Sequence, residues 1–109
     1  MHRDHGIFLA TMHSRTRVQL TFYRKEDEQQ LIRLCAPMDY GPFRAAKNKI
    51  DRYHFWDYES DEGPHSLSLL PDRIVEIMAT EKGFDPAEFV TWSLTKSPWF
   101  VARDWGAYS

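Results

Sequence analysis

The stretch TRVQLTFYR, residues 16–24, decides the fold class. Apolar and polar side chains alternate along it, and β-branched and aromatic residues favour a strand that is buried on one face. We expect three side chains to face the core: Val18, Leu20 and Phe22. The acidic residues 26–28 predict a hairpin turn, and residues 30–36 predict a second strand. Pro37 is expected to end that strand because proline has no backbone N–H to donate.

Further short elements are expected on both sides of this hairpin. Residues 6–13 group apolar side chains without alternation, which predicts a two-turn helix. Asp85 and Pro86 predict a second short helix, ending near residue 92, because aspartate caps free backbone amides and proline suits the first helical position. Three more strands are expected, over residues 50–58, 66–70 and 74–80.

Two local alternatives stay open at this point. Residues 38–49 form either a functional loop or a loop that conceals a short strand. The strand over residues 74–80 either begins directly or follows a helical turn. In both cases, five short strands with polar turns predict a mainly β (α+β) domain, an antiparallel sheet curled into a small barrel.

The composition fits one domain over residues 1–109. Hydrophobic residues make up 42% of the chain, and 15% aromatic residues indicate packing by large rings. The apolar runs fall far short of the roughly 20 residues of a membrane span, and the start of the chain lacks a signal-peptide pattern. We therefore expect a soluble cytoplasmic protein without a membrane partner. The single Cys35 is expected to be a small buried hydrophobe in a reducing compartment.

Charge is distributed unevenly along the chain. Residues 1–54 hold ten Lys or Arg and six Asp or Glu, a net charge of +4, whereas residues 55–109 hold four and ten, a net charge of −6. The total of −2 argues against indiscriminate coating of DNA. The asymmetry is nevertheless compatible with one basic and one acidic face.

The stretch RYHFWDY, residues 52–58, carries aromatic rings on both faces of a strand. One set is enough to fill the core, so the other set either meets a planar ligand or partner or is covered by the rest of the chain. The tail, residues 93–109, holds four more rings: Trp99, Phe100, Trp105 and Tyr108. We expect this tail to pack back on the domain or onto a partner, such as the second subunit of a homodimer.

Three arginines are the candidate ligand-binding residues. Arg33 lies within an apolar strand, Arg52 opens the aromatic strand, and Arg73 follows a proline corner. An arginine in apolar surroundings extends to solvent, pairs with a carboxylate or awaits an anionic ligand. Carboxylates for structural pairing are available at Asp39, Asp51, Asp57 and Asp72. Structural pairing and ligand binding are therefore both open.

The order of these features resembles the WYL-domain family. A helix and an alternating strand precede Arg-x-x-x-Pro at residues 33–37 and an arginine-led aromatic strand at residues 52–53. A leucine-rich strand ending in Arg-Ile at residues 73–74 and Phe-Asp-Pro at residues 84–86 follow. The similarity spans roughly residues 7–89, and the order and spacing of these weak motifs give it its specificity.

This resemblance implies a small SH3/Sm-like barrel of about five strands with a short helix at each end. In the family, the barrel usually accompanies a winged-helix DNA-binding domain in bacterial transcription regulators and senses ligands, in several cases nucleotides or nucleic acid. The implied ligand-binding residues are Arg33, Arg52 and Arg73, with Tyr53 and Trp56 near the aromatic signature. The sequence departs from the family in two ways. The Trp-Tyr-Leu triplet is replaced by YHFW at residues 53–56, and without a winged helix the chain is not expected to regulate transcription alone.

Signals for catalysis or metal binding are weak. His54 and His65 flank the acidic turn of residues 57–62 without a recognised ligand spacing, and the sequence has no glycine-rich phosphate loop. We predict no catalytic residue, metal or cofactor. The expected function is a non-enzymatic regulatory module that binds a nucleotide or a nucleic-acid segment. The alternative is a protein–protein interaction or dimerisation module that uses the aromatic strand and the tail.

Overall fold

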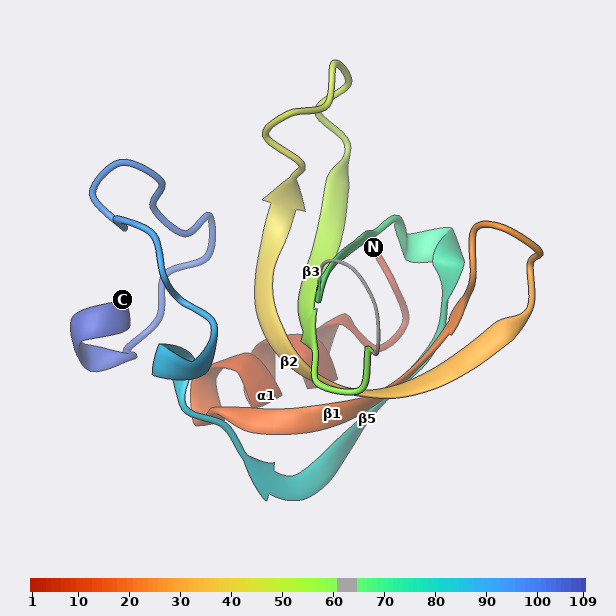
Figure 1. The fold of residues 1–109 in the computed structure, drawn as a ribbon, viewed down its shortest axis with the longest axis horizontal. Coiled ribbons are helices and arrows are strands. Elements are labelled where there is room, and N and C mark those ends of the chain that lie inside the picture. The colour runs from red at the N-terminus through yellow and green to blue at the C-terminus, as the bar shows by residue number, and fades with distance from the viewer. Residues whose placement is uncertain (61–64) are drawn as a thin grey trace.

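The residues that the structure describes fold as one open antiparallel sheet with one α-helix packed against it (Figure 1). This computed structural model describes residues 1–60 and 65–109. The helix is α1 (His5–Ser14), and the strands are β1 (Thr16–Tyr23), β2 (Gln30–Pro42), β3 (Asp51–Asp57), β4 (Ser66–Leu69) and β5 (Ile74–Gly83). The described ranges also contain single turns of 3₁₀ helix: η1 (Pro71–Arg73), η2 (Pro86–Glu88) and η3 (Gly106–Tyr108).

The order of the strands is β4-β3-β2-β1-β5, with every neighbouring pair antiparallel. The mainly β class, the five strands and the N-terminal helix are confirmed. Among the described residues, however, no hydrogen-bonded ladder joins β4 to β5, so both strands are edges and the expected closure into a barrel is not confirmed. None of the helices in the described ranges is long and apolar enough to cross a membrane.

The second strand is longer than expected. β2 continues through Pro37 to Pro42, so the prediction that Pro37 ends it was wrong. The pairing of β1 with β2 reaches only as far as Val18 and Cys35, and beyond that point β2 pairs with β3 alone. Proline is tolerated there for two reasons. On the side where β1 has stopped pairing, no neighbouring strand needs an N–H from Pro37, and on the β3 side the ladder is interrupted by a bulge between Pro37 and Asp39.

The second helix is shorter than expected. Asp85 does cap a turn, because its carboxylate accepts from the N–H of Ala87 at 3.0 Å while Glu88 accepts from the N–H of Asp85. The turn ends at Glu88, and the side chains of Phe89 and Val90 are buried in the core. The prediction of a helix to residue 92 was wrong. The chain leaves the helical path after Glu88 because Phe89 and Val90 pack into the core. The helical turn before β5 is present as η1.

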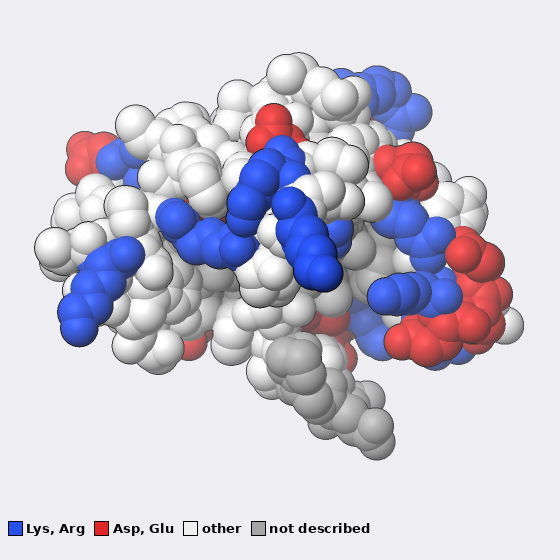
Figure 2. All heavy atoms as spheres, turned by 90° about the horizontal axis from the view of Figure 1, so that it is seen from above, with Lys and Arg blue, Asp and Glu red and all other residues white. Residues whose placement is uncertain are grey.

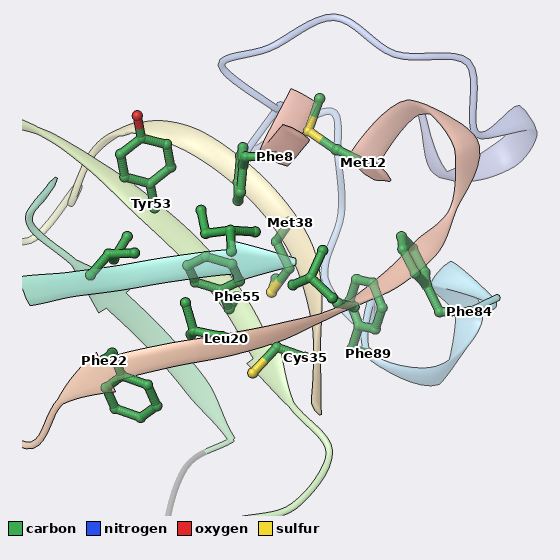
Figure 3. Packing of buried hydrophobic residues seen from close by; sticks show 14 of the residues in the cluster. Phe8, Met12, Leu20, Phe22, Cys35, Met38, Tyr53, Phe55, Phe84 and Phe89 are labelled. Atoms are coloured by element: carbon green, nitrogen blue, oxygen red, sulfur yellow. The ribbon is translucent and has the colours of Figure 1, made fainter. Parts of the chain in front are cut away.

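The core lies between α1 and the concave face of the sheet (Figure 3). Val18, Leu20 and Phe22 are buried there, as their alternation predicts. Phe8 of the helix packs edge-on against Tyr53 and Phe55, with ring centroids 5.0 and 5.3 Å apart. Cys35 is buried, and this burial raises the pKa of its thiol far above the ordinary value.

Candidate functional site

Arg33, Arg52 and Arg73 line one groove of about 1000 Å³. They come from β2, β3 and η1 respectively. Strand β4 forms one wall of this arginine groove, and the turn between β1 and β2 contributes another. Three guanidinium groups that are far apart in the sequence thus lie together in a groove beside β4, an edge strand of the sheet. Two more cations that the sequence analysis did not single out, Arg24 and Lys25, also line the groove.

Arg33 is positioned by a structural ion pair. It lies on the core face of the sheet, opposite Leu20, and its side chain runs outward along apolar neighbours into the groove. Its Nε lies 3.8 Å from Oδ2 of Asp57, whose side chain is only 5% exposed. Asp57 also accepts from the N–H of Glu59 at 2.9 Å. For Arg33, the structural pairing that the sequence left open is therefore present.

Arg73 holds the β1–β2 turn. Its guanidinium donates to both carboxylate oxygens of Glu28, at 3.0 and 2.8 Å, and to the carbonyl oxygen of Tyr23 at 3.3 Å. Glu28 has a positive φ of 58° in this turn, and its side chain is 67% exposed. An ion pair with an exposed partner contributes only about 0–1 kcal/mol. A phosphate could therefore replace Glu28 at little cost.

Arg52 is the least satisfied of the three. Its Nε is buried and has no hydrogen-bond partner among the described residues. The nearest aromatic ring contact is Phe43, with the guanidinium carbon 6.0 Å from the ring centroid. Leaving a buried donor unpaired costs about 1–3 kcal/mol. An acceptor in the groove would remove that cost once the side chain turns its Nε toward it. Arg17 also has an unpaired buried Nε but does not line the groove, so Arg52 is the strongest pointer to a ligand among the groove residues.

The two aromatic residues expected beside these arginines lie elsewhere. Tyr53 is 0% exposed in the core, and its hydroxyl bonds the N–H of His2 at 2.9 Å and Nδ1 of His5 at 2.8 Å. Burial raises the pKa of Tyr53. Trp56 lies on the opposite face of β3, where its ring stacks on His65 and Phe89. Neither ring is available to a ligand in the arginine groove, and the half-buried ring that lines it is Tyr23.

The groove carries mixed charge with cations in excess. Five Lys or Arg and three acids, Glu26, Glu28 and Asp57, line it. Figure 2 shows Asp and Glu clustered beside Lys and Arg on the side of the β1–β2 turn, at the right of the view. Arg33 and Arg73 already face acids, and Arg24 pairs with Asp27 and Glu26. The available positive potential therefore comes mainly from Arg52 and Lys25.

The aromatic tail packs on its own domain. Trp105 is 2% exposed, and its indole N–H donates to the carbonyl oxygen of Met12 at 2.9 Å. The indole of Trp99 donates to the carbonyl oxygen of Tyr108 at 2.8 Å. Of the four residues expected at an interface, only Phe100 is classed as exposed, at 44%. The sequence left open whether the tail packs on its own domain or on a partner, and in the structure it packs on its own domain.

Arg103 fastens the tail to the sheet. Its side chain is 0% exposed and lies between the rings of Trp99 and Trp105, 4.0 and 4.5 Å from their centroids. It donates to Asp39 at 3.0 Å and to the carbonyl oxygen of Met38. Burial lowers the pKa of Arg103 to about 10, against the opposing effect of Asp39. We refer to this arrangement of Arg103 and Asp39 as the tail latch.

His54 and His65, the two histidines that flank the acidic turn, make hydrogen bonds within the domain. His54 bonds Ser68 at 2.8 Å and the carbonyl oxygen of Gly41 at 2.9 Å, and His65 bonds the carbonyl oxygen of Asp57 at 2.8 Å. Within the described ranges, no three His, Cys, Asp or Glu side chains come together as metal ligands. Residues 61 and 62 of the acidic turn lie outside the described residues.

Comparison with known proteins adds no relative. No family model, curated protein or solved structure matches this chain.

Proposed function

We propose that the chain is a non-enzymatic binding module that holds an anionic ligand, such as a nucleotide or a short nucleic-acid segment, in the arginine groove. The observation that carries this proposal is the buried Nε of Arg52, which has no partner in the described part of the chain. Arg33 and Arg73 line the same groove. Guanidinium groups bind phosphate oxygens through paired N–H donors, and such charge-assisted bonds are stronger than neutral ones.

Each arginine has a different part in this proposal. Arg52 donates to the phosphate from the lining of the groove. Arg73 exchanges the exposed Glu28 for the ligand, while Arg33 stays paired with Asp57 and supplies longer-range attraction. Tyr23 is the ring on which a base would stack, an interaction worth about 1–3 kcal/mol per base.

We further propose that the open sheet is a variant of the SH3/Sm-like barrel of the WYL-domain family, in which β4 and β5 are not joined. The order of the arginine motifs supports this likeness. A ligand sensor acting with a separate DNA-binding partner, in the reducing cytoplasm suggested by the single buried thiol, would fit it.

The test is binding of ATP and of a fluorescein-labelled ten-residue oligothymidylate at several salt concentrations. We expect affinity to fall as salt rises, because phosphate contacts release counterions. The variant Arg33→Ala/Arg52→Ala/Arg73→Ala should lose binding. The charge-matched control Arg15→Gln/Lys82→Gln/Lys96→Gln removes three cations that do not line the groove and should bind almost normally. Equal losses in both variants would mean that net charge, not the groove, attracts the probe.

The single variant Arg52→Met separates a ligand role from a structural one. It places a methyl group where the unpaired buried Nε lay, so we expect unchanged or slightly higher stability together with weaker binding. A large loss of stability with normal binding would show that Arg52 serves the fold.

The alternative proposal is a self-association module in which the partly exposed rings of Trp92 and Phe100 meet a second copy. Sedimentation of the full chain over a range of concentrations distinguishes it: a concentration-dependent dimer supports self-association, and a monomer at all concentrations excludes it.

A further inference from the structure

A second groove lies on the other side of β4, between the tail and the sheet. It measures about 400 Å³ and is lined by residues from the β2–β3 connection, from β3 and β4, and from the tail. Leu67 and Ser68 line this groove and the arginine groove alike, so β4 separates the two. Its volume is at the lower end of the roughly 300–1,000 Å³ of small-molecule sites. We call it the tail groove.

Large apolar side chains that line the tail groove are exposed to solvent. Phe43, Trp92 and Phe100 all line it and are 42%, 37% and 44% exposed. Phe55 and Leu67 form deeper parts of the lining. Eight large hydrophobic residues are exposed in the described chain, and these three are its aromatic members. The other five, Met1, Ile7, Ile32, Ile50 and Met78, do not line the groove, so the gathering of the exposed rings at one hollow is informative. An apolar ligand that fills the hollow would remove this surface from water.

The buried polar groups in this lining are already used by the protein. The Asp39 carboxylate accepts from the backbone N–H groups of Tyr40, Phe100 and Val101 and from Arg103. The Gly41 carbonyl oxygen can only accept, so Nε2 of His54 carries the proton and Nδ1 accepts from Ser68. Neither Asp39 nor His54 has strong bonding capacity left for a ligand. The deep part of the groove therefore selects for an apolar group.

Arg44 supplies a charge at the rim. Its guanidinium lies 4.3 Å from the centroid of the Phe100 ring and donates to the carbonyl oxygen of Pro98. Arg44 is exposed and has no ion pair with any described carboxylate. A guanidinium donates five N–H groups, so Arg44 keeps donors for an anion at the mouth. Lys49, which bonds the carbonyl oxygen of Arg44 at 3.0 Å, adds a second positive charge nearby.

We propose that the tail groove binds a small amphiphilic anion, with a short aliphatic chain or single ring in the apolar hollow and a carboxylate held by Arg44. Shape and lining select the apolar part, and the cationic rim selects the sign of the head group. This site is distinct from the arginine groove, because Arg33, Arg52 and Arg73 do not line it, although both grooves share the β4 wall.

The probes are octanoate, octan-1-ol and octylamine, added to the full chain and followed by the indole N–H resonances in nitrogen-15 spectra. We expect octanoate to bind most tightly and to shift the resonances of Trp92 and Trp99, which line the groove. The Trp105 resonance should not move, because its N–H is held inside by Met12. Equal affinity for octylamine, or no shift of Trp92 and Trp99 at saturating octanoate, overturns the proposal.

Two variants sharpen the test. Arg44→Gln should weaken octanoate binding roughly tenfold and octan-1-ol binding less than about twofold, since only the carboxylate loses a charge-assisted bond. Ser66→Trp, at an exposed position of the β4 wall, should fill part of the hollow and weaken both ligands. Lys82→Gln is the matched control and should bind normally.

Three further results would also support or overturn the proposal of an anion site in the tail groove. The double variant Arg33→Ala/Arg73→Ala leaves the contact of Arg52 with Phe43 in place and should bind octanoate normally. This separates the fate of this proposal from that of the nucleotide site. Octanoate affinity unchanged by Arg44→Gln would overturn it. A dimer that forms without ligand and hides Trp92 and Phe100 would also overturn it, because a second copy would then be the occupant.

Discussion

The variant Arg103→Ala tests whether the tail latch stabilises the fold. Arg103 has a side chain that is 0% exposed, and its partner Asp39 is 10% exposed at the side chain. The substitution removes the guanidinium from between two indoles and leaves the carbonyl oxygens of Met38 and Val101 without this donor. It also leaves a nearly buried carboxylate without its counterion.

The expected loss can be worked from these contacts. Removing one partner of a buried ion pair costs about 3–5 kcal/mol. Asp39 keeps three backbone N–H donors at 2.9–3.1 Å, so the lower end, about 3 kcal/mol, applies. Loss of the two ring contacts adds about 1 kcal/mol. The total of about 4 kcal/mol is a large fraction of the roughly 5–15 kcal/mol that stabilises a domain.

Urea unfolding followed by far-ultraviolet circular dichroism measures this loss without depending on tryptophan signals. Arg44→Ala is the matched control, because Arg44 also stacks on a ring and donates to a carbonyl oxygen, but it is exposed and lacks an acid. Its expected cost is below about 1 kcal/mol. A double-mutant cycle with Asp39→Asn should give a coupling of at least about 2 kcal/mol. A loss for Arg103→Ala no greater than that of the control, or a coupling near zero, would refute the reasoning.

Three further predictions concern the tail and the outer face of the sheet. Deleting residues 97–109 should unfold the domain in circular dichroism, since removing a buried tryptophan alone costs about 3–5 kcal/mol, and a folded monomer would contradict this. Gly41→Ala should cost about 1–3 kcal/mol in urea unfolding by overpacking, because a new Cβ would lie 2.5 Å from the Phe100 ring. Burial lowers the pKa of His54 below its ordinary value of 6.5. The unfolded chain therefore takes up a proton between the two values that the folded protein does not, and the free energy of unfolding should fall as the pH is lowered below about 6.5. His54→Gln should show less of this pH dependence.

The strands were predictable because alternation is a local property. Val18, Leu20 and Phe22 face the core as their spacing indicates, and the same parity places Tyr53 and Phe55 inside and Trp56 outside. The length of β2 was not predictable from Pro37, because tolerance of a proline depends on whether a neighbouring strand needs its N–H. That depends on where β1 stops pairing with β2, which is a tertiary property.

The site was predictable only in part. The convergence of the three arginines follows from the places of Arg33 and Arg52 on neighbouring strands and of Arg73 on the turn before β5, but their partners do not follow from the sequence. Glu28 reaches Arg73 only because the β1–β2 turn folds back over η1. The rings expected beside the arginines were misplaced for another reason: Trp56 meets Phe89, a residue 33 positions later, and no periodicity indicates that contact.

The tail latch depends on a single extra residue in β2. Pro37 pairs with Phe55 and Asp39 pairs with His54, so β2 advances two residues while β3 advances one. A regular ladder would turn Asp39 toward the core face beside Tyr53, because side chains alternate strictly along a strand. The bulge instead turns Asp39 to the outer face, where it receives Phe100, Val101 and Arg103. The same shift places Tyr40 beside Tyr53, with ring centroids 4.6 Å apart. One local irregularity thus decides both what completes the core and where the tail, with its apolar groove, is fastened.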